Sequence, residues 1–219
     1  MEILKVLVGS RAHGLHNDDS DYDYRSVFVA PTSKILSLGA QPKSTVWIEG
    51  TGAGRTDDTS WEVKHFLDLA VHCNPTILEV FVAPVVQASE FSYRLRGLFQ
   101  YIWSPVAVRD AFIGYGHNQR KKFLDNKDNR SNKYAVAYLR VLYQARELLS
   151  KGYLPVDMQL TEVYDTLKRW RLGNMSSGEV IDTTEEWTYK VHCASAGCTQ
   201  KPDVERANDF LLDIRRQCW

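Results

Sequence analysis

The sequence predicts an α+β fold in which the strands come first and the helices follow. Two short apolar, β-branched runs lie within the first 30 residues, at 3–8 and 24–30, and both are typical of buried strands. From about residue 59 onward, apolar residues recur at the three- and four-residue spacing of amphipathic helices. We therefore expect a core over residues 1–88 and a helical region over residues 89–219 packed on that core.

Three segments of the chain are predicted as strands. "ILKVLV" (3–8) and "YRSVFVA" (24–30) are apolar, and Pro31 ends the second because proline lacks a backbone N–H. "STVWIE" (44–49) is a shorter candidate within a stretch rich in glycine, serine and threonine. The "TGAGR" segment (51–55) is predicted as a turn.

Helices account for most of the remaining chain. Thr59 and Glu62 are spaced for a capping box, which predicts a helix that starts there and ends before Asn74-Pro75. The clearest helix covers residues 132–152, where Gly152 ends a mostly apolar pattern. Further helices are predicted after Pro75, at 89–103, from Ser104-Pro105 to about 122, after Thr161, and near 203–216.

An acidic cluster, Asp18, Asp19, Asp21 and Asp23, lies between the first two predicted strands. Side chains two residues apart on a strand share a face, so Asp21 and Asp23 project together. Two neighbouring carboxylates repel each other unless a cation lies between them, and Mg²⁺ prefers such oxygen ligands. A solvated turn is the ordinary alternative. An EF-hand loop is excluded, because counting from Asp19 puts Tyr24 at the position that needs glycine.

A Gly9-Ser10 pair directly follows the first predicted strand. A turn at this point, followed by a short helix that ends at Gly14, offers backbone N–H groups to a phosphate. Gly9 permits a close approach of the phosphate to the backbone, and Ser10 adds a hydroxyl donor. A Walker A loop is absent from the sequence.

Gly-Ser, ten intervening residues and Asp-x-Asp, framed by two strands, resemble the first motif of the nucleotidyltransferase superfamily of DNA polymerase β. The chain is most similar to the RNA repair pathway polymerase-β-like family. Residues 57–84 resemble that family's second block, and residues 133–156 and 167–180 resemble its C-terminal helical blocks. The resemblance implies a polymerase-β-like core, a small mixed sheet with helices, followed by a helical C-terminal part.

The resemblance also implies residue roles. Gly9 and Ser10 would hold the triphosphate of an incoming NTP such as ATP, and Asp21 and Asp23 would bind two Mg²⁺ ions, with Mn²⁺ as an alternative metal. An NMP would then pass to an acceptor hydroxyl and pyrophosphate would leave. A third carboxylate would complete the metal site. The family block favours Asp57, followed by Asp58, and then by Glu62 or Glu79, which also suit a capping role and a helix surface.

Further contacts are predicted from basic residues. Arg25 lies two residues beyond Asp23, on the same strand face, and either contacts a phosphate or neutralises the aspartates. Lys133 and Arg140 share one stripe of the predicted long helix. They are phosphate candidates, with a solvated helix face as the equal alternative.

The net charge is zero, but residues 94–151 carry twelve basic side chains against four acidic ones, an excess of eight. The basic residues are Arg94, Arg96, Arg109, Arg120, Lys121, Lys122, Lys127, Arg130, Lys133, Arg140, Arg146 and Lys151. Solvated helix faces account for such a bias in most proteins, whereas a polynucleotide acceptor would require it.

We therefore expect a nucleic-acid end as the acceptor, RNA rather than DNA, bound by the Arg120-Lys121-Lys122 cluster. Tyr115 and His117 are candidates for base stacking, with ordinary packing as the alternative. The competing hypotheses are nucleotidylation of a small molecule or protein, and a non-catalytic protein that binds nucleotides or nucleic acid.

We expect a cytoplasmic protein without a membrane partner. Hydrophobic residues make up 44% and charged residues 25%, and no apolar run reaches the roughly 18 residues of a membrane span. The N-terminus shows no signal-peptide pattern, and the four cysteines form no disulfide framework. Buried thiols are favoured over a zinc site built from His72, Cys73, His192, Cys193 and Cys198.

Overall fold

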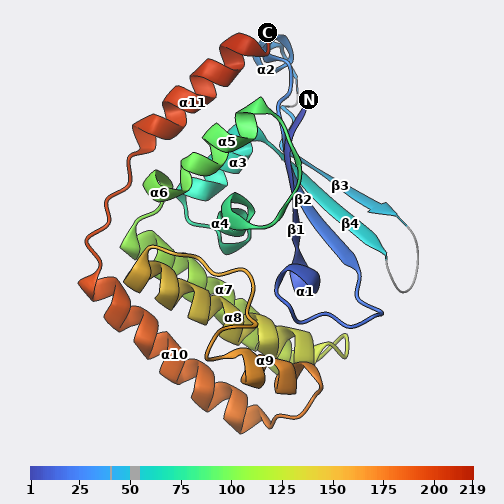
Figure 1. Cartoon of the computed structure of the whole chain (residues 1–219), viewed down its shortest axis with the longest axis vertical. Coiled ribbons are helices and arrows are strands. Elements are labelled where there is room, and N and C mark those ends of the chain that lie inside the picture. Colours follow the sequence, from blue (N-terminus) through green and yellow to red (C-terminus); the bar gives the residue numbers. More distant parts are fainter. Residues whose placement is uncertain (40, 50–54) are drawn as a thin grey trace. The chain divides into compact units, whose positions relative to one another are not determined.

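The computed structural model describes residues 1–39, 41–49 and 55–219, and it confirms the α+β class (Figure 1). The described residues form a five-stranded sheet in the order β3-β4-β2-β1-β5. Its strands are β1 (Glu2–Val8), β2 (Tyr22–Phe28), β3 (Ser44–Glu49), β4 (Thr56–Glu62) and β5 (Val85–Ala88). Of the turn predicted at 51–55, only Arg55 lies within the described residues.

The sheet is mixed, because one of its strand pairs is parallel. β2 runs parallel to β4, whereas β1 pairs antiparallel with both β2 and β5, and β3 pairs antiparallel with β4. The second residue of β2, Asp23, is opposite Val8 of β1 on one side and Asp57 of β4 on the other. The register of the central strands therefore decides which acidic side chains become neighbours.

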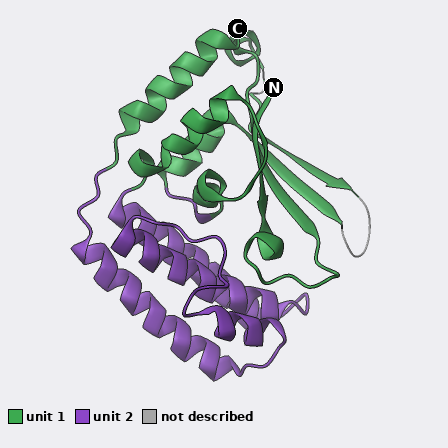
Figure 2. Ribbon diagram, in the orientation of Figure 1, with its two compact units in different colours: residues 1–72, 76–103, 202–219 green, residues 73–75, 104–201 purple. Residues whose placement is uncertain are grey.

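The chain divides into two compact units (Figure 2). Unit 1 comprises residues 1–72, 76–103 and 202–219, and unit 2 comprises residues 73–75 and 104–201. Unit 1 holds the sheet with α1 (Gly9–Ala12), α2 (Thr32–Leu36), α3 (Val63–Val71), α5 (Glu90–Gly97), α6 (Phe99–Ile102), α11 (Val204–Gln217) and nearly all of α4 (Pro75–Val82). Its boundaries differ from the expected division after residue 88, because α5, α6 and α11 group with the sheet.

Unit 1 has an apolar core between the sheet and its helices. Val6 of β1 and Val27 of β2 are fully buried, and the ring centroids of Phe66 and Phe81 lie 5.0 Å apart. Each such side chain contributes about 1.5–3 kcal/mol through burial. The last helix, α11, is fixed to the same unit by Arg215, which donates to Glu62 at 2.6 Å and to the carbonyl oxygen of Ala30 at 3.0 Å.

The capping box predicted at Thr59 and Glu62 is wrong. Residues 56–62 pair in parallel with β2, so the chain remains extended through Glu62 and α3 begins at Val63. Glu62 is itself the N-cap residue, and its carboxylate accepts from the backbone N–H of Lys64 at 2.8 Å. Strand pairing, which local sequence does not reveal, overrides the local helical signal here.

Unit 2 is helical throughout its described elements. They are α7 (Pro105–Asp125), α8 (Ser131–Lys151), α9 (Tyr164–Arg171) and α10 (Ser177–Gly197). The predicted helix at 132–152 is confirmed as α8, and Gly152 ends it in a left-handed conformation. Helices α7 and α8 approach closely at Gly116, where an added Cβ would lie 2.8 Å from the ring of Tyr138.

None of the helices in the described parts of the chain has both the length and the apolar content needed to cross a membrane. All four cysteines are free thiols. Cys73 is buried, and this burial raises the pKa of its thiol to about 11, although a backbone hydrogen bond with Ser104 opposes the shift.

Candidate active site

Strand β2 carries two kinds of side chain on its two faces. Asp23 and Arg25 lie on one face, and Tyr22, Tyr24 and Ser26 lie on the other, as the alternation of a strand requires. On the second face, aromatic rings alternate with basic side chains. The rings of Tyr22 and Tyr24 are stacked, with their centroids 6.4 Å apart. The guanidinium of Arg11 covers Tyr22 at 3.9 Å, and the ammonium of Lys5 covers Tyr24 at 4.7 Å. The acidic face is therefore the candidate for chemistry.

Asp23 and Asp57 are direct register partners on the parallel strands β2 and β4. Residues paired in this way point to the same face of the sheet, so the two carboxylates are neighbours. The Oδ1 atom of Asp57 is buried and finds no hydrogen-bond partner in the described part of the chain. A guanidinium nitrogen of Arg25 lies 3.6 Å from that atom, an ion pair longer than a hydrogen bond. The arrangement holds a carboxylate oxygen ready for a cation.

Asp21 immediately precedes β2, and a second arginine stands beside it. The Nε of Arg55 lies 4.0 Å from Asp21 Oδ2 and is itself buried without a hydrogen-bond partner among the described residues. Sequence analysis identified Arg25 but missed Arg55. A basic residue just before the predicted second block was the available signal. Together the two arginines offset part of the repulsion between the aspartates.

The four candidates for the third carboxylate occupy different surroundings. Asp58 points to the opposite face, where it pairs with Lys5 at 2.7 Å and accepts from the Ser26 hydroxyl at 3.0 and 3.2 Å. Glu62 caps α3 and binds Arg215, and Glu79 is buried against His13. Asp57 is the candidate that lies beside Asp23.

Gly9 begins α1 with a positive φ of 69°, a conformation that favours glycine. A Cβ added to Gly9 would lie 2.0 Å from Oδ2 of Asp23, so the turn and the acidic strand are in direct contact. The sequence predicted a close approach of a phosphate to Gly9. The structure adds that the Asp23 carboxylate fills the space into which a side chain at position 9 would project. Ser10, the next residue, is half-buried in α1.

Two side chains that sequence analysis missed hold the segment after Gly9. Arg11 donates to the backbone oxygen of Ser20 at 2.8 Å and to that of Asp21 at 3.3 Å. The ring of His13 lies 2.8 Å from a carboxylate oxygen of Glu79, and both side chains are buried. Their position directly after Gly-Ser, in "GSRAHGL", was the signal available in the sequence.

Within residues 1–39, 41–49 and 55–219, no three His, Cys, Asp or Glu side chains are gathered closely enough to hold a metal ion by themselves. The expected set of Asp21, Asp23 and Asp57 is therefore not a closed protein cage. Mg²⁺ typically takes one or two carboxylates and completes its shell with substrate phosphates and water. The neighbouring carboxylates of Asp23 and Asp57 match this mode of binding, because Oδ1 of Asp57 has no hydrogen-bond partner among the described residues.

The remaining predicted residues belong to unit 2, whereas Gly9, Ser10, Asp21, Asp23, Arg25 and Asp57 belong to unit 1. Lys133 and Arg140 lie on α8, where Arg140 donates to Gln144 at 2.9 Å. In the basic cluster on α7, Arg120 pairs with Glu185 at 3.3 Å, and Lys121 and Lys122 are exposed. His117 is exposed and Tyr115 is half-buried.

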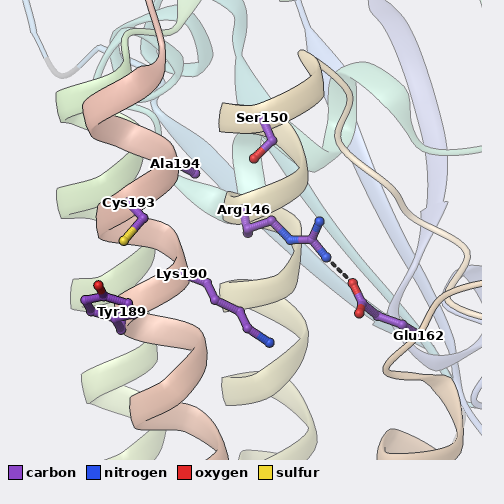
Figure 3. A pocket seen from close by; sticks show the side chains of 7 residues that line it. All are labelled: Arg146, Ser150, Glu162, Tyr189, Lys190, Cys193 and Ala194. Atoms are coloured by element: carbon purple, nitrogen blue, oxygen red, sulfur yellow. Dashed lines mark hydrogen bonds and ion pairs between the residues drawn. The ribbon is translucent and has the colours of Figure 1, made fainter.

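Unit 2 also contains a hollow of about 510 Å³ (Figure 3). Its lining consists of Arg146, Ser150, Glu162, Tyr189, Lys190, Cys193 and Ala194. Arg146 forms ion pairs with Glu147 and Glu162, and Lys190 pairs with Glu186 at 2.7 Å. Each cation on the lining is thus balanced by a carboxylate.

Comparison with known proteins places these observations in a family. The model of the RNA repair pathway DNA polymerase beta family matches residues 3–171. The chain is 28% identical over 155 residues to the uncharacterized protein YcgL of Bacillus subtilis (strain 168), a match that covers 70% of this chain. The chain spans 58% of the length of that relative. A crystal structure of a nucleotidyltransferase-like protein from Exiguobacterium sibiricum 255-15 covers 99% of this chain and 74% of its own, at 10% identity and a TM-score of 0.34.

Proposed function

The chain belongs to the RNA repair pathway DNA polymerase beta family, and from this premise we propose that it is a nucleotidyltransferase with a specific reaction. The protein moves an NMP from an NTP to an acceptor hydroxyl, releases pyrophosphate, and uses an RNA end as the acceptor. The reaction depends on Mg²⁺.

The observation that carries this proposal is the contact between three elements of unit 1. Asp23 on β2 is the register partner of Asp57 on β4, and its carboxylate fills the space where a side chain of Gly9 would stand. A turn suited to phosphate thus touches a carboxylate pair suited to a divalent cation.

Each residue then has a defined task. Backbone N–H groups of the Gly9-Ser10 turn and the Ser10 hydroxyl would bind the triphosphate. Asp23 and Asp57 would hold the metal together with the substrate phosphates, and Asp21 would stand beside them as a further ligand. Bound Mg²⁺ supplies charge stabilisation of the attacking and leaving oxygens. Asp57, the carboxylate on the second strand, orients the acceptor hydroxyl. Arg25 and Arg55 would offset the charge of the carboxylates before the metal binds and would contact phosphate oxygens afterwards.

The choice of an RNA end as the acceptor rests on the basic excess in residues 94–151 and on the family description. Part of this excess is neutralised by carboxylates outside the stretch, since Arg94 pairs with Asp213, Arg120 with Glu185, and Arg146 with Glu162. The exposed Lys121 and Lys122 remain the strongest candidates for contacts with backbone phosphates, which attract basic side chains regardless of sequence.

Transfer of a radiolabel from each of four α-labelled NTPs tests the proposal. The protein is incubated with Mg²⁺ and either an RNA or a DNA oligonucleotide, and the Asp23→Asn variant serves as the inactive control. We expect labelled RNA with the wild-type protein and none with the variant. Label that appears on the protein itself or on a small molecule would replace RNA as the acceptor, and no label in any fraction would contradict nucleotidyl transfer.

A further inference from the structure

A buried hydrogen bond between two ionisable side chains joins the end of the Gly9-Ser10 turn to a helix far along the chain. Nε2 of His13 lies 2.8 Å from Oε1 of Glu79, which is on α4, 66 residues further along the chain. The two side chains are only 8% and 9% exposed. His13 directly follows α1, and its backbone N–H donates to the carbonyl oxygen of Gly9 at 3.0 Å. The pair therefore acts on the same short segment that begins at Gly9.

The segment from Gly9 to His13 is held at two points. In its middle, Arg11 donates to the backbone carbonyls of Ser20 and Asp21, which lie just before β2. At its end, His13 is fixed to α4 by Glu79. The first anchor sets the segment against the strand that carries Asp21 and Asp23. The second sets it against the helical layer of unit 1.

Stability alone does not explain two ionisable groups at this buried position. A buried ion pair gains little over apolar side chains of similar volume, because desolvation offsets the attraction between the charges. A hydrogen bond is directional, whereas an apolar contact is not. A hydrogen-bonded pair therefore fixes the position of one side chain relative to the other. Here the fixed group is the end of the turn.

We propose that His13 is a positioning residue for the triphosphate, with Glu79 as its anchor. The inference rests on the proposed function, because it assigns the Gly9-Ser10 turn to phosphate binding. A phosphate bound by backbone N–H groups requires those groups to be fixed before the ligand arrives, because ordering them on binding would lower the affinity. Displacement of a positioned group by about 1 Å lowers catalysis by roughly 100-fold.

The test replaces the His13–Glu79 pair with apolar side chains of similar volume. His13→Leu, Glu79→Leu and the double variant are compared with wild type. Arg215→Leu, which breaks another buried pair of unit 1 at Glu62, serves as the matched control. Calorimetry measures the binding of magnesium tripolyphosphate, which presents a triphosphate without a base. Thermal denaturation of each variant is recorded separately.

We expect the double variant to unfold near the wild-type temperature and to bind magnesium tripolyphosphate about tenfold more weakly or worse. Arg215→Leu should show the reverse, a lower unfolding temperature with unchanged affinity. His13→Gln, whose amide nitrogen reaches the position of Nε2, should restore binding, whereas the shorter His13→Asn should not. If the leucine variants do not fold, the comparison of His13→Gln with His13→Asn tests the positioning role by itself.

Two failures are distinguishable. Absence of tripolyphosphate binding by the wild-type protein would overturn the proposed function, and this inference with it. Wild-type binding that persists unchanged in the double variant, or equally in His13→Gln and His13→Asn, would overturn the inference alone.

Discussion

Asp23 on β2 and Asp57 on β4 are direct partners across the parallel pair of strands, and their neighbours Tyr24 and Asp58 are partners on the opposite face. Strands in a sheet lie about 4.8 Å apart, so the two carboxylates on the first face repel each other at short range. On the opposite face, Asp58 is neutralised by Lys5. The strands β2 and β4 thus carry the acidic site on one face and the Lys5–Asp58 ion pair on the other.

This separation predicts different outcomes for two adjacent substitutions. Asp57→Asn should lower the turnover of nucleotide transfer by roughly 100-fold or more and leave stability nearly unchanged. Asp58→Asn should lower stability by about 1–3 kcal/mol, because Lys5 loses its partner in a partly buried position. Urea denaturation and one transfer assay on both proteins provide the comparison. Loss of activity confined to Asp58→Asn would reverse the assignment.

Asp21→Asn and Asp23→Asn should each abolish nucleotide transfer while the fold is retained. Each substitution removes one negative charge from a site where carboxylates lie close together, with Arg25 beside Asp57 and Arg55 beside Asp21. Wild-type protein should gain about 2.7 kcal/mol of stability when Mg²⁺ and NTP are present at about 100 times Kd, and neither variant should show that gain. Differential scanning calorimetry measures it. Wild-type turnover in Asp23→Asn would show that the site lies elsewhere.

Substitutions in the turn should rank by the space they require. Gly9→Val combines a strained positive φ with a Cβ placed 2.0 Å from the Asp23 carboxylate, so it should displace that carboxylate and eliminate NTP binding. Ser10→Ala removes a hydroxyl donor and should weaken binding by about tenfold. Equilibrium binding of Mg²⁺-NTP compares the two. Equal affinities in Gly9→Val and wild type would contradict the role of this turn in NTP binding.

Reversal of the exposed charges on α7 should weaken RNA binding and spare NTP binding. The double variant Lys121→Glu/Lys122→Glu is matched by Lys168→Glu/Lys190→Glu, which changes the net charge of unit 2 equally. We expect the first pair to reduce RNA affinity and to flatten its dependence on salt concentration, because fewer counterions are released on binding. A filter-binding titration at several salt concentrations measures both effects. Salt-independent binding by wild type would favour a small-molecule or protein acceptor.

Glu179 predicts an acid limit for the stability of unit 2. Hydrogen bonds from Arg169, followed by one from Trp170, lower the pKa of Glu179 from its usual 4.5 to about 2. The stabilisation is therefore complete above about pH 4.5 and is lost as the pH falls towards 2. Glu179→Gln should remove this part of the pH dependence of the unfolding temperature. Identical acid profiles for the two proteins would exclude a contribution from Glu179.

Much of the acidic site could be predicted from short stretches of sequence, because strand patterns and residue spacing within them are enough to place Asp21 and Asp23. The two strands that frame Asp-x-Asp are apolar runs, and the shared face of Asp21 and Asp23 follows from strand periodicity. The choice of Asp57 over Asp58 came from the resemblance to a family. Its structural support comes from the parallel register of β2 and β4, which no local pattern specifies.

Other features depend on contacts between distant parts of the chain. Thr59 and Glu62 have capping-box spacing, yet pairing with β2 keeps them in a strand. The short strand β5, which pairs with β1, has no distinctive sequence of its own. The pairing of His13 with Glu79 across 66 residues is likewise a product of the fold.

Unit 1 is built from segments that the ribosome makes at widely separated times. Unit 1 needs residues 202–219, whose Arg215 neutralises the buried Glu62, yet all of unit 2 from residue 104 to 201 is made before them. At about 5–20 residues per second, the ribosome takes roughly 5–20 s to add that intervening stretch. During this interval all five strands described here have been made but α11 has not, so we expect the apolar surface that buries Ala207, Phe210 and Ile214 of α11 to be exposed. Unit 2, which is continuous from residue 104, is free to fold first.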